Sequence, residues 1–290
     1  MPDQRHYRYR VVDVFTRIPL EGNPLAVFPD SRGIDSDTMQ RIAKELNLSE
    51  TVFLEPAKLP GCAVAFRIFT PSREMLFAGH PTVGGSFVAM QEDIVARDAD
   101  RFVVEEKIGP VPIRVERGDL PMIWLTTPPI TFEKSCDPVL CADALGLKAH
   151  DLLTIAPQIV SAGNPMLFVP VKGKTEVDRA WLSRDAFEKL KSTGETFGVF
   201  VFAPTAEGAY SRMFAPDHGI TEDPATGSAT GPLAAFMKKH DLLPSGGQKR
   251  FVSEQGTKMG RRSFLYFEFS SEDISVGGFV TPLIEAVMTL

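Results

Sequence analysis

Two turns of the chain carry polar side chains directly before stretches that lack charged residues. The first turn reads Ala78-Gly-His-Pro-Thr82, and the second reads Glu222-Asp-Pro-Ala-Thr-Gly-Ser228. Proline suits the first position of a helix, and the free backbone N–H groups of a first helical turn can bind an anion. These turns therefore predict two helix starts that could hold the carboxylate of a small acid without any arginine.

The polar residues near these turns also have ordinary structural interpretations. Asp223 before a proline is a good N-cap, and His80 could equally well stabilise a turn. Glu50 precedes the apolar run 51–54, and a single carboxylate after a helix is usually solvated. Ser228 alone indicates little. The residue types by themselves leave catalysis and a structural role open.

Motifs for cofactor chemistry are missing from the sequence. No G-x-x-x-x-G-K-[ST] occurs, and no G-x-G-x-x-G follows a predicted strand. The five histidines lack the H-x-x-x-H spacing of a zinc site. Cys62, Cys136 and Cys141 are too scattered for a zinc site or a disulfide framework. We therefore expect neither a cofactor nor a metal.

Three short segments recur in the same order, at offsets of 141, 145 and 143 residues. The segments and their later copies are Gly22-Asn-Pro-Leu-Ala-Val-Phe28 at 163–169, Arg67-Ile-Phe-Thr-Pro71 at 212–216, and Pro81-Thr-Val-Gly84, more loosely, at 224–227. Matches in one order at nearly one offset indicate two homologous halves. If the halves face each other, the two helix starts converge on one cleft. We place the first half at residues 1–120, joined by 281–290, and the second at 121–280.

Strand patterns dominate both halves, while predicted helices are few. The expected strands are residues 7–15, 24–28, 51–54, 62–69, 102–106, 111–117 and 121–127, then 155–160, 166–171, 197–203, 209–214, 250–254, 263–269 and 274–280. A final strand after about residue 280 is expected to cross back and pack on the first half.

The helix patterns predict how each half is built. Residues 36–46 form an amphipathic stripe, with Asp35 or Ser36 as N-cap and Asn47 as a left-handed C-cap. Residues 81–90 and 228–237 carry no charged side chain, and a helix without a polar face is surrounded by protein. We predict an α+β fold in which each half is a curved antiparallel sheet, or barrel, around one buried helix.

Composition excludes several classes of protein. Hydrophobic residues make up 43% of the 290 residues and charged residues 23%, which is typical of a globular chain. The net charge of −6 without a basic block argues against a nucleic-acid partner. No apolar run approaches the roughly 18 residues of a membrane span, and the N-terminus is too polar for a secretory signal. We expect a cytoplasmic protein without a membrane partner.

Several motifs together resemble the PhzF-like family, which is named for phenazine biosynthesis. They are Gly22-Asn-Pro-Leu-Ala-Val27, Asn47-Leu-Ser-Glu-Thr51, Phe77-Ala-Gly-His-Pro-Thr82 and Glu222-Asp-Pro-Ala-Thr-Gly-Ser-Ala229, with a later stretch at 254–261. The resemblance runs from about residue 8 to residue 280. It implies a diaminopimelate-epimerase-like fold of two pseudo-symmetric halves with the active site between them.

The resemblance also implies roles for individual residues. Glu50 takes the place of the family's proton shuttle, with His80, Asp223 and Ser228 around the reacting atoms. Gly79, Thr82, Gly227 and Ser228 belong to the helix starts that bind the substrate. Asp223 is expected to hold His80 in one tautomer or to share its proton.

The implied function is that of a cofactor-independent isomerase. It would move a proton on a small carboxylic or amino acid by general acid and base catalysis, as namesake members do with dihydro-hydroxyanthranilate. Related epimerases use one cysteine from each half, but none of the three cysteines here lies near either helix start. Arg262 departs from the family, which often has proline there. The family commonly forms homodimers, so a homodimer is expected.

Two alternatives remain open at this point. The protein could be an amino-acid racemase or epimerase that uses a carboxylate and a histidine in place of two cysteines. It could also be a non-catalytic protein of the same fold that binds a small acid. Inversion of the product's chirality without a bond shift would distinguish a racemase or epimerase from the isomerase. Binding of small acids without proton exchange would distinguish a binding protein from an enzyme.

Overall fold

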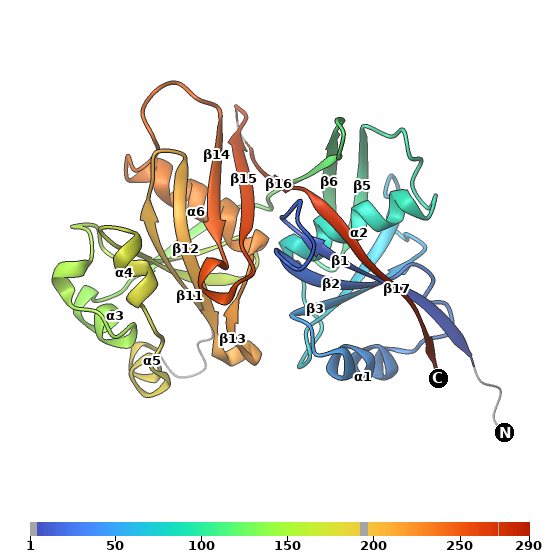
Figure 1. The fold of residues 1–290 in the computed structure, drawn as a ribbon, viewed down its shortest axis with the longest axis horizontal. Coiled ribbons are helices and arrows are strands. Elements are labelled where there is room, and N and C mark those ends of the chain that lie inside the picture. Colours follow the sequence, from blue (N-terminus) through green and yellow to red (C-terminus); the bar gives the residue numbers. More distant parts are fainter. Residues whose placement is uncertain (1–4, 192–196, 272) are drawn as a thin grey trace. The chain divides into compact units, whose positions relative to one another are not determined.

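The computed structural model describes residues 5–191, 197–271 and 273–290 (Figure 1). Internal contacts divide the chain into two compact units, Met1–Thr126 with Gly277–Leu290 and Thr127–Val276. The boundaries predicted from the sequence, 1–120 with 281–290 for the first half and 121–280 for the second, remain a prediction.

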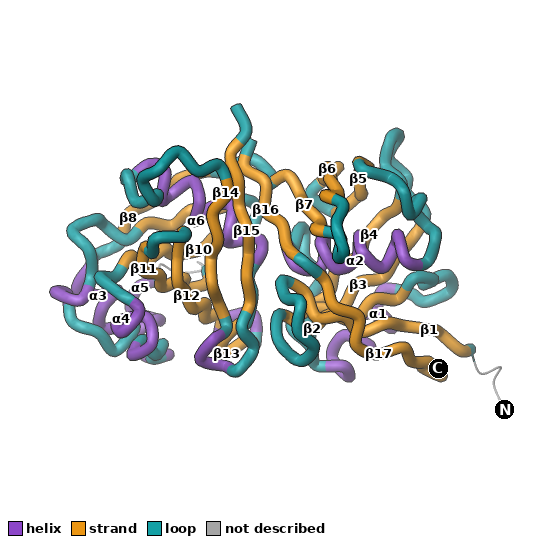
Figure 2. Tube along the Cα trace, turned by 45° about the horizontal axis from the view of Figure 1, so that its top comes forward, coloured by secondary structure: helices purple, strands orange, loops and turns teal. Residues whose placement is uncertain are grey.

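The first unit is a curved sheet around one helix. The strands, in the order in which they pair, are β17 (Val280–Thr289), β1 (His6–Val14), β2 (Asn23–Phe28), β3 (Glu50–Glu55), β4 (Val64–Phe69), β5 (Arg101–Glu106), β6 (Gly109–Glu116) and β7 (Met122–Thr126). Helix α2 (Gly79–Gln91) contacts β1, β2, β3, β4, β7 and β17, and Figure 2 shows it among these strands. Helix α1 (Ser36–Leu46) packs on β3 and β4.

Small residues allow α2 to lie inside the sheet. Every residue of α2 from Gly79 to Met90 is buried. A Cβ atom on Gly84 would lie 2.6 Å from Leu25 Cδ2, and one on Gly85 would lie 2.9 Å from the Phe66 ring. Since larger side chains would push the strands away, the uncharged and glycine-rich sequence and the central position of the helix have one cause.

Some strand pairs differ from the antiparallel arrangement that was expected. Most pairs in the first unit are antiparallel, but β2–β3 and β4–β5 are parallel. Two parallel neighbours need a crossover connection between them. Here α1 connects β2 to β3 and α2 connects β4 to β5, so each predicted helix makes the adjacent strand pair parallel.

The second unit repeats this plan. Its strands pair in the order β8 (Thr131–Ser135), β9 (Gln158–Ser161), β10 (Pro165–Pro170), β11 (Gly198–Pro204), β12 (Gly208–Ala215), β14 (Arg250–Gln255) and β15 (Ser263–Phe269), with β13 (Ile220–Asp223) on the end of β12. Again β10–β11 and β12–β14 are parallel. Helix α6 (Gly227–Lys239) contacts β9, β10 and β15, and β16 (Ile274–Gly278) contains the boundary between the units.

The second unit also contains short helices that the sequence analysis did not predict. They are α3 (Pro138–Ala144), α4 (Lys174–Arg179) and α5 (Arg184–Leu190). Their buried residues share one core with the sheet, which includes Ala142, Val177 and Phe187. Helices of six or seven residues are too short to give a clear periodic pattern, which explains why they were missed.

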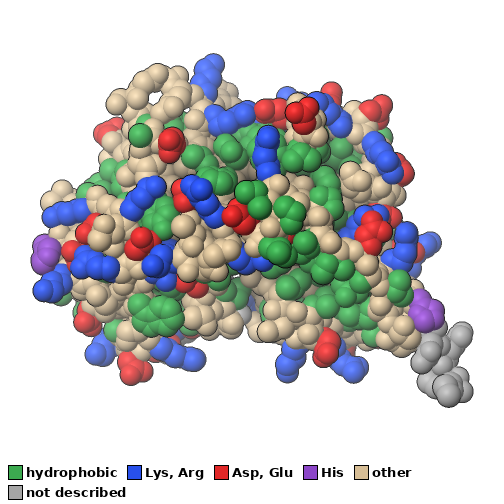
Figure 3. All heavy atoms as spheres, in the orientation of Figure 1, with side chains coloured by type: hydrophobic (Ala, Val, Ile, Leu, Met, Phe, Trp, Pro, Cys, Tyr) green, Lys and Arg blue, Asp and Glu red, His purple; other side chains and the backbone are tan. Residues whose placement is uncertain are grey.

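Most of the other expected elements are present. Each expected strand overlaps a strand of the structure, while β8 and β13 were not predicted. Asp35 is the N-cap of α1, where its side chain accepts a bond from Thr38 N, and Asn47 ends the helix with a φ of 50°. The final strand, β17, pairs with β1, and its residues Ile284 and Val287 are 48% and 59% exposed. Figure 3 shows hydrophobic side chains on the face of the first unit that β17 crosses.

Candidate active site

Glu50 and His80 lie together in the first unit. Glu50 is the first residue of β3, which starts three residues after the left-handed Asn47 that ends α1. His80 is the second residue of α2. Glu50 Oε2 lies 3.4 Å from His80 Nε2, and the two side chains are only 12% and 4% exposed. The fold thus joins a carboxyl group and an imidazole that are thirty residues apart in sequence.

Asn23 determines which nitrogen of His80 carries the proton. Asn23 is the first residue of β2, and its Nδ2 lies 3.3 Å from His80 Nδ1. An amide nitrogen can only donate, so Nδ1 accepts and the ring proton is on Nε2, facing Glu50. Asn23 therefore fixes the tautomer, and the role expected of Asp223 toward His80 stays a prediction. Asn23 was not among the predicted site residues, although the recurring Gly-Asn-Pro motif contains it.

Burial determines the charge of His80. Desolvation lowers the pKa of the His80 imidazole to about 3. The ring is consequently neutral at neutral pH. It can donate its Nε2 proton to a hydrogen bond, but it is a weak base and it carries no second proton to give.

The first turn of α2 is held by a residue that the sequence analysis missed. Gly79 begins the helix and is buried, and the Thr82 hydroxyl donates to Ala78 O at 2.6 Å. The same hydroxyl contacts the carboxyl group of Glu106, the last residue of β5. Glu106 is 4% exposed, and its burial raises the pKa of the carboxyl group to about 8.

The other predicted site residues lie in the second unit. Asp223 is the last residue of β13, and Gly227 and Ser228 are the first two residues of α6. Thr226, not Asp223, occupies the N-cap position, and its hydroxyl donates to Asp223 Oδ2. Asp223 and Ser228 are buried, at 5% and 9% exposure. The simple N-cap interpretation of Asp223 is therefore wrong.

Gln255 binds this second turn through both ends of its amide. Its Nε2 donates to Asp223 O at 2.7 Å and to Thr226 Oγ1 at 3.0 Å, while its Oε1 accepts from Thr226 N at 3.1 Å. Gln255 is fully buried and is the last residue of β14. It belongs to the later family motif but was not predicted as a site residue.

The two helix starts correspond residue by residue. Both helices have thirteen residues and begin with glycine, so His80 occupies the place of Ser228. Thr230 donates to Thr226 O at 3.1 Å, as Thr82 does to Ala78 O. The loose match between Pro81 and Pro224 is not part of this correspondence.

Neither proline takes the first helical position that the sequence predicted. Pro81 is the third residue of α2, whereas Pro224 lies three residues before α6. The N-cap residues before the two helices also differ in conformation, with φ −151° and ψ 132° at Ala78 and φ −105° and ψ 82° at Thr226.

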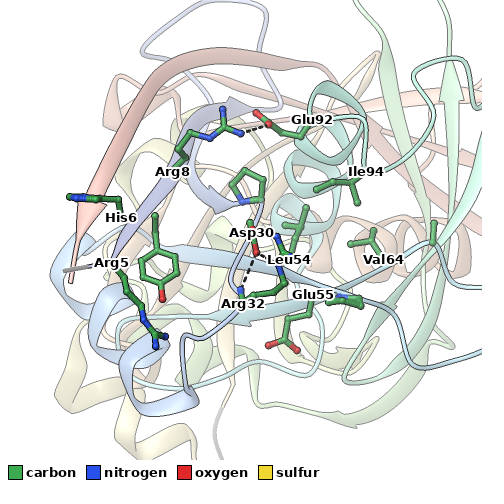
Figure 4. A pocket seen from close by; sticks show the side chains of 14 residues that line it. Arg5, His6, Arg8, Asp30, Arg32, Leu54, Glu55, Val64, Glu92 and Ile94 are labelled. Carbon is green, nitrogen blue, oxygen red and sulfur yellow. Dashed lines mark hydrogen bonds and ion pairs between the residues drawn. The ribbon is translucent and has the colours of Figure 1, made fainter. Parts of the chain in front are cut away.

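A groove of about 990 Å³ in the first unit does not contain the predicted residues (Figure 4). It is lined by Leu54 and Glu55, at the opposite end of β3 from Glu50. Its arginines already have partners: Arg8 pairs with Glu92 at 3.2 Å and Arg32 with Asp30 at 2.6 Å. We therefore do not assign the groove to the candidate site.

The described residues contain neither a cluster of metal ligands nor a helix suited to a membrane span. Within residues 5–191, 197–271 and 273–290, no three His, Cys, Asp or Glu side chains are grouped to hold a metal ion. In the same ranges, no helix combines the length and the apolar character needed to cross a bilayer.

Comparisons with known proteins bear on the whole chain. A family model described as "Phenazine biosynthesis-like protein" matches residues 12–284. The chain is 39% identical over 274 residues to an uncharacterized isomerase of Mesorhizobium japonicum, covering 90% of each protein. It is 36% identical over 262 residues to the trans-2,3-dihydro-3-hydroxyanthranilate isomerase of Pseudomonas aeruginosa, covering 90% of this chain and 89% of that one.

Solved structures confirm the predicted fold class. A PhzF-family phenazine biosynthesis protein of Bacillus anthracis superposes with a TM-score of 0.87 at 22% identity, covering 99% of this chain and all of the other. A probable proline racemase of Agrobacterium radiobacter superposes with a TM-score of 0.67 at 12% identity, covering 97% and 92%. The α+β, epimerase-like fold predicted from the sequence is confirmed.

Proposed function

Since this isomerase belongs to the phenazine biosynthesis-like family, we propose that it moves a proton on a small carboxylic or amino acid without a cofactor, using Glu50 as acid and base. The observation that carries the proposal is the buried pair of Glu50 Oε2 and His80 Nε2, 3.4 Å apart. A buried carboxyl group beside a neutral donor suits repeated uptake and release of one proton.

Glu50 is the better candidate for the proton shuttle within this pair. The low pKa of His80 makes the imidazole a poor base, and the neutral ring has only the Nε2 proton that faces Glu50. His80 can instead orient the carboxyl group of Glu50, while Asn23 keeps the ring in the required tautomer.

The proposed reaction breaks one C–H bond and forms another. Glu50 takes a proton from a carbon next to a group that can delocalise the electron pair. The double bond then shifts, and protonated Glu50 returns the proton to a second carbon, so that substrate and product are isomers and the enzyme is unchanged. The first turn of α2, which has no acidic residue, can bind the substrate carboxylate through its N–H groups.

The test is proton exchange in deuterated water, followed by NMR. The protein is incubated with a panel of small carboxylic and amino acids that includes trans-2,3-dihydro-3-hydroxyanthranilate, the substrate named for the Pseudomonas aeruginosa relative. We expect deuterium to enter a C–H position of one compound with the intact protein and not with Glu50→Gln. Glu55→Gln, the same change at the other end of β3, is the matched control and should retain exchange.

The outcomes separate the alternatives. Exchange that persists in Glu50→Gln contradicts the role of Glu50. Exchange with inversion at one carbon and no bond shift would indicate a racemase or epimerase. Compounds that bind, raising the melting temperature, but never exchange would indicate a binding protein.

A further inference from the structure

Glu106 is a buried acid for which the proposed reaction has no role. It ends β5, and its side chain contacts Thr82, two residues after His80 in the first turn of α2. It is 4% exposed, and its Oε2 has no hydrogen-bond partner among the described residues. A charged carboxylate with one oxygen buried and unsatisfied is strongly unfavourable, whereas a neutral carboxylic acid tolerates this environment.

The hydrogen bonds of Thr82 also indicate a protonated Glu106. A threonine hydroxyl has one hydrogen, so Thr82 cannot donate both to Ala78 O, 2.6 Å away, and to Glu106 Oε1. Both contacts become hydrogen bonds when a protonated Glu106 donates to Thr82 Oγ1 and Thr82 donates to Ala78 O. In this arrangement Glu106 donates to Thr82, Thr82 donates to Ala78 O, and the first turn of α2 is held by a chain of two bonds.

The second unit has an amide in the corresponding place. Strand β5 reads Arg101-Phe-Val-Val-Glu-Glu106 and strand β14 reads Arg250-Phe-Val-Ser-Glu-Gln255. Each strand follows the buried helix of its unit, and each last residue contacts the start of that helix: Glu106 contacts Thr82, the fourth residue of α2, and Gln255 contacts Thr226, the N-cap of α6. An amide has a donor and an acceptor, as a protonated carboxyl group has, whereas a carboxylate only accepts. Gln255 thus places a neutral side chain that can donate at the corresponding end of β14.

We propose that Glu106 is a positioning residue that acts in its neutral form, holding the first turn of α2 so that His80 and the N–H groups of Gly79 and His80 stay in place for the reaction. This inference rests on the proposed function. Loss of the Glu106 proton would remove the donor to Thr82. It would also put a negative charge at a helix start that is to bind a carboxylate, which opposes binding.

The charged groups near Glu106 are engaged elsewhere. Of its two neighbours in the sequence, Lys107 pairs with Glu74 at 3.3 Å, and Glu105 accepts hydrogen bonds from the backbone N–H groups of Lys58 and Leu59. On α2 the titratable neighbour is His80, which is neutral above about pH 3. Burial raises the pKa of Glu106 to about 8, against smaller opposing effects of the Thr82 hydroxyl and the Ala78 N–H. Ionisation of Glu106 is therefore expected near pH 8.

The main experiment needs no substrate. Protein with ¹³C-labelled glutamate and ¹⁵N-labelled histidine is titrated by NMR from pH 5 to pH 10. We expect one glutamate carboxyl signal to titrate near pH 8 and the His80 ring signals to shift with the same midpoint. In Glu106→Gln both changes should be absent, while the ring signals keep their low-pH positions. Ring signals that titrate alike in both proteins, or that do not respond in either, would overturn the proposal.

Unfolding gives a second readout that does not depend on catalysis. The folded pKa of Glu106 lies above its unfolded value, so the stability that its proton provides is present at low pH and is lost as pH rises toward 8. Glu106→Gln should therefore gain stability relative to the natural protein between about pH 5 and pH 8. A constant difference across this range would contradict a neutral, buried Glu106.

The activity readout uses the compound that exchanges in the panel above. We expect Glu106→Gln to retain activity within about threefold at pH 7. Above pH 8 the natural protein should lose about tenfold per pH unit in kcat/KM, and the variant should not. Identical pH profiles of the natural protein and Glu106→Gln would overturn the positioning role of Glu106, even if Glu50→Gln abolishes exchange. The result for Glu50→Gln tests only the proposed function and does not decide the role of Glu106.

Discussion

The starts of α2 and α6 share one backbone plan but differ in chemistry. Each start belongs to a buried helix and has a threonine whose hydroxyl donates to the carbonyl four residues earlier. Each is also contacted by the last residue of the strand that follows the helix. The first start has His80 and Glu106 where the second has Ser228 and Gln255. The repeated fold thus has titratable side chains at these two positions in the first unit and non-titrating counterparts in the second.

A second pair of equivalent residues, Arg67 and Arg212, differs in burial between the two units. Arg67 on β4 pairs with Glu74, and Arg212 on β12 pairs with Glu222, both through Nε at 2.8 Å. Arg67 is 24% exposed, whereas Arg212 is 6% exposed and also donates to the backbone carbonyls of residues 177, 178 and 180. The second unit therefore uses its arginine to hold the α4 segment, and the first unit leaves the equivalent group partly hydrated.

The largest effect is expected from comparing acid-to-amide changes in the two units. Glu50→Gln should reduce exchange by about 10³-fold, since loss of general acid and base catalysis typically removes 10²–10⁴. Asp223→Asn should reduce it by no more than about tenfold, because an amide oxygen can still accept the hydrogen bond that Asp223 Oδ2 receives from Thr226. Rates of deuterium uptake measure both, and equal losses would show that the proton chemistry is shared by the two units.

The next effect concerns the two arginines. Arg212→Met should lower the free energy of unfolding by about 3–5 kcal/mol, because Glu222 is left buried without its partner. Arg67→Met, at the partly exposed pair, should cost about 1 kcal/mol or less. Urea unfolding at pH 7 compares them. A larger loss for Arg67→Met would contradict the difference in burial.

A reciprocal change in the second unit should introduce pH dependence there. Gln255→Glu places an acid where Glu106 lies in the first unit, so its folded pKa should be raised by burial. The stability of this variant relative to the natural protein should fall as pH rises from about 4 to 8, by roughly 1–3 kcal/mol. Denaturant unfolding at several pH values measures this. A pH-independent difference would show that the turn can open to water.

The smallest effect separates the two threonines. Thr82→Val and Thr230→Val each remove a bond to a helix carbonyl, which is worth about 1 kcal/mol. Thr82→Val should cost more, by about 1 kcal/mol, because it also removes the contact with buried Glu106. Melting temperatures of the two variants give the comparison. Equal shifts in melting temperature would show that the contact between Thr82 and Glu106 does not stabilise the folded protein.

Sequence patterns predicted the parts of the fold that depend on local chemistry. The uncharged stretches 81–90 and 228–237 indicated buried helices because no polar face could meet water. The parallel pairs β2–β3 and β4–β5 were missed, since pairing direction depends on how a crossover helix packs and not on the strand residues.

The candidate site was only partly readable from the sequence. The resemblance supplied Glu50 and His80, but only the fold shows that these two groups lie 3.4 Å apart and that Asn23 fixes the ring. The sequence does carry a signal for Glu106 and Gln255, because each ends a repeated Arg-Phe-Val-x-Glu segment, at 101–106 and 250–255. The catalytic roles of Glu50, His80, Asp223 and Ser228 remain predictions.

The pairing of β17 with β1 has a consequence for synthesis of the protein. Strand β1 lies near the start of the chain, and its partner along its whole length is residues 280–289. A ribosome releases the entire second unit before it releases this partner, so residues 127–276 can fold while one edge of β1 is still unpaired. The nascent first unit therefore exposes an open strand edge for the time it takes to make about 150 residues, the period in which it is most prone to aggregate or to need a chaperone.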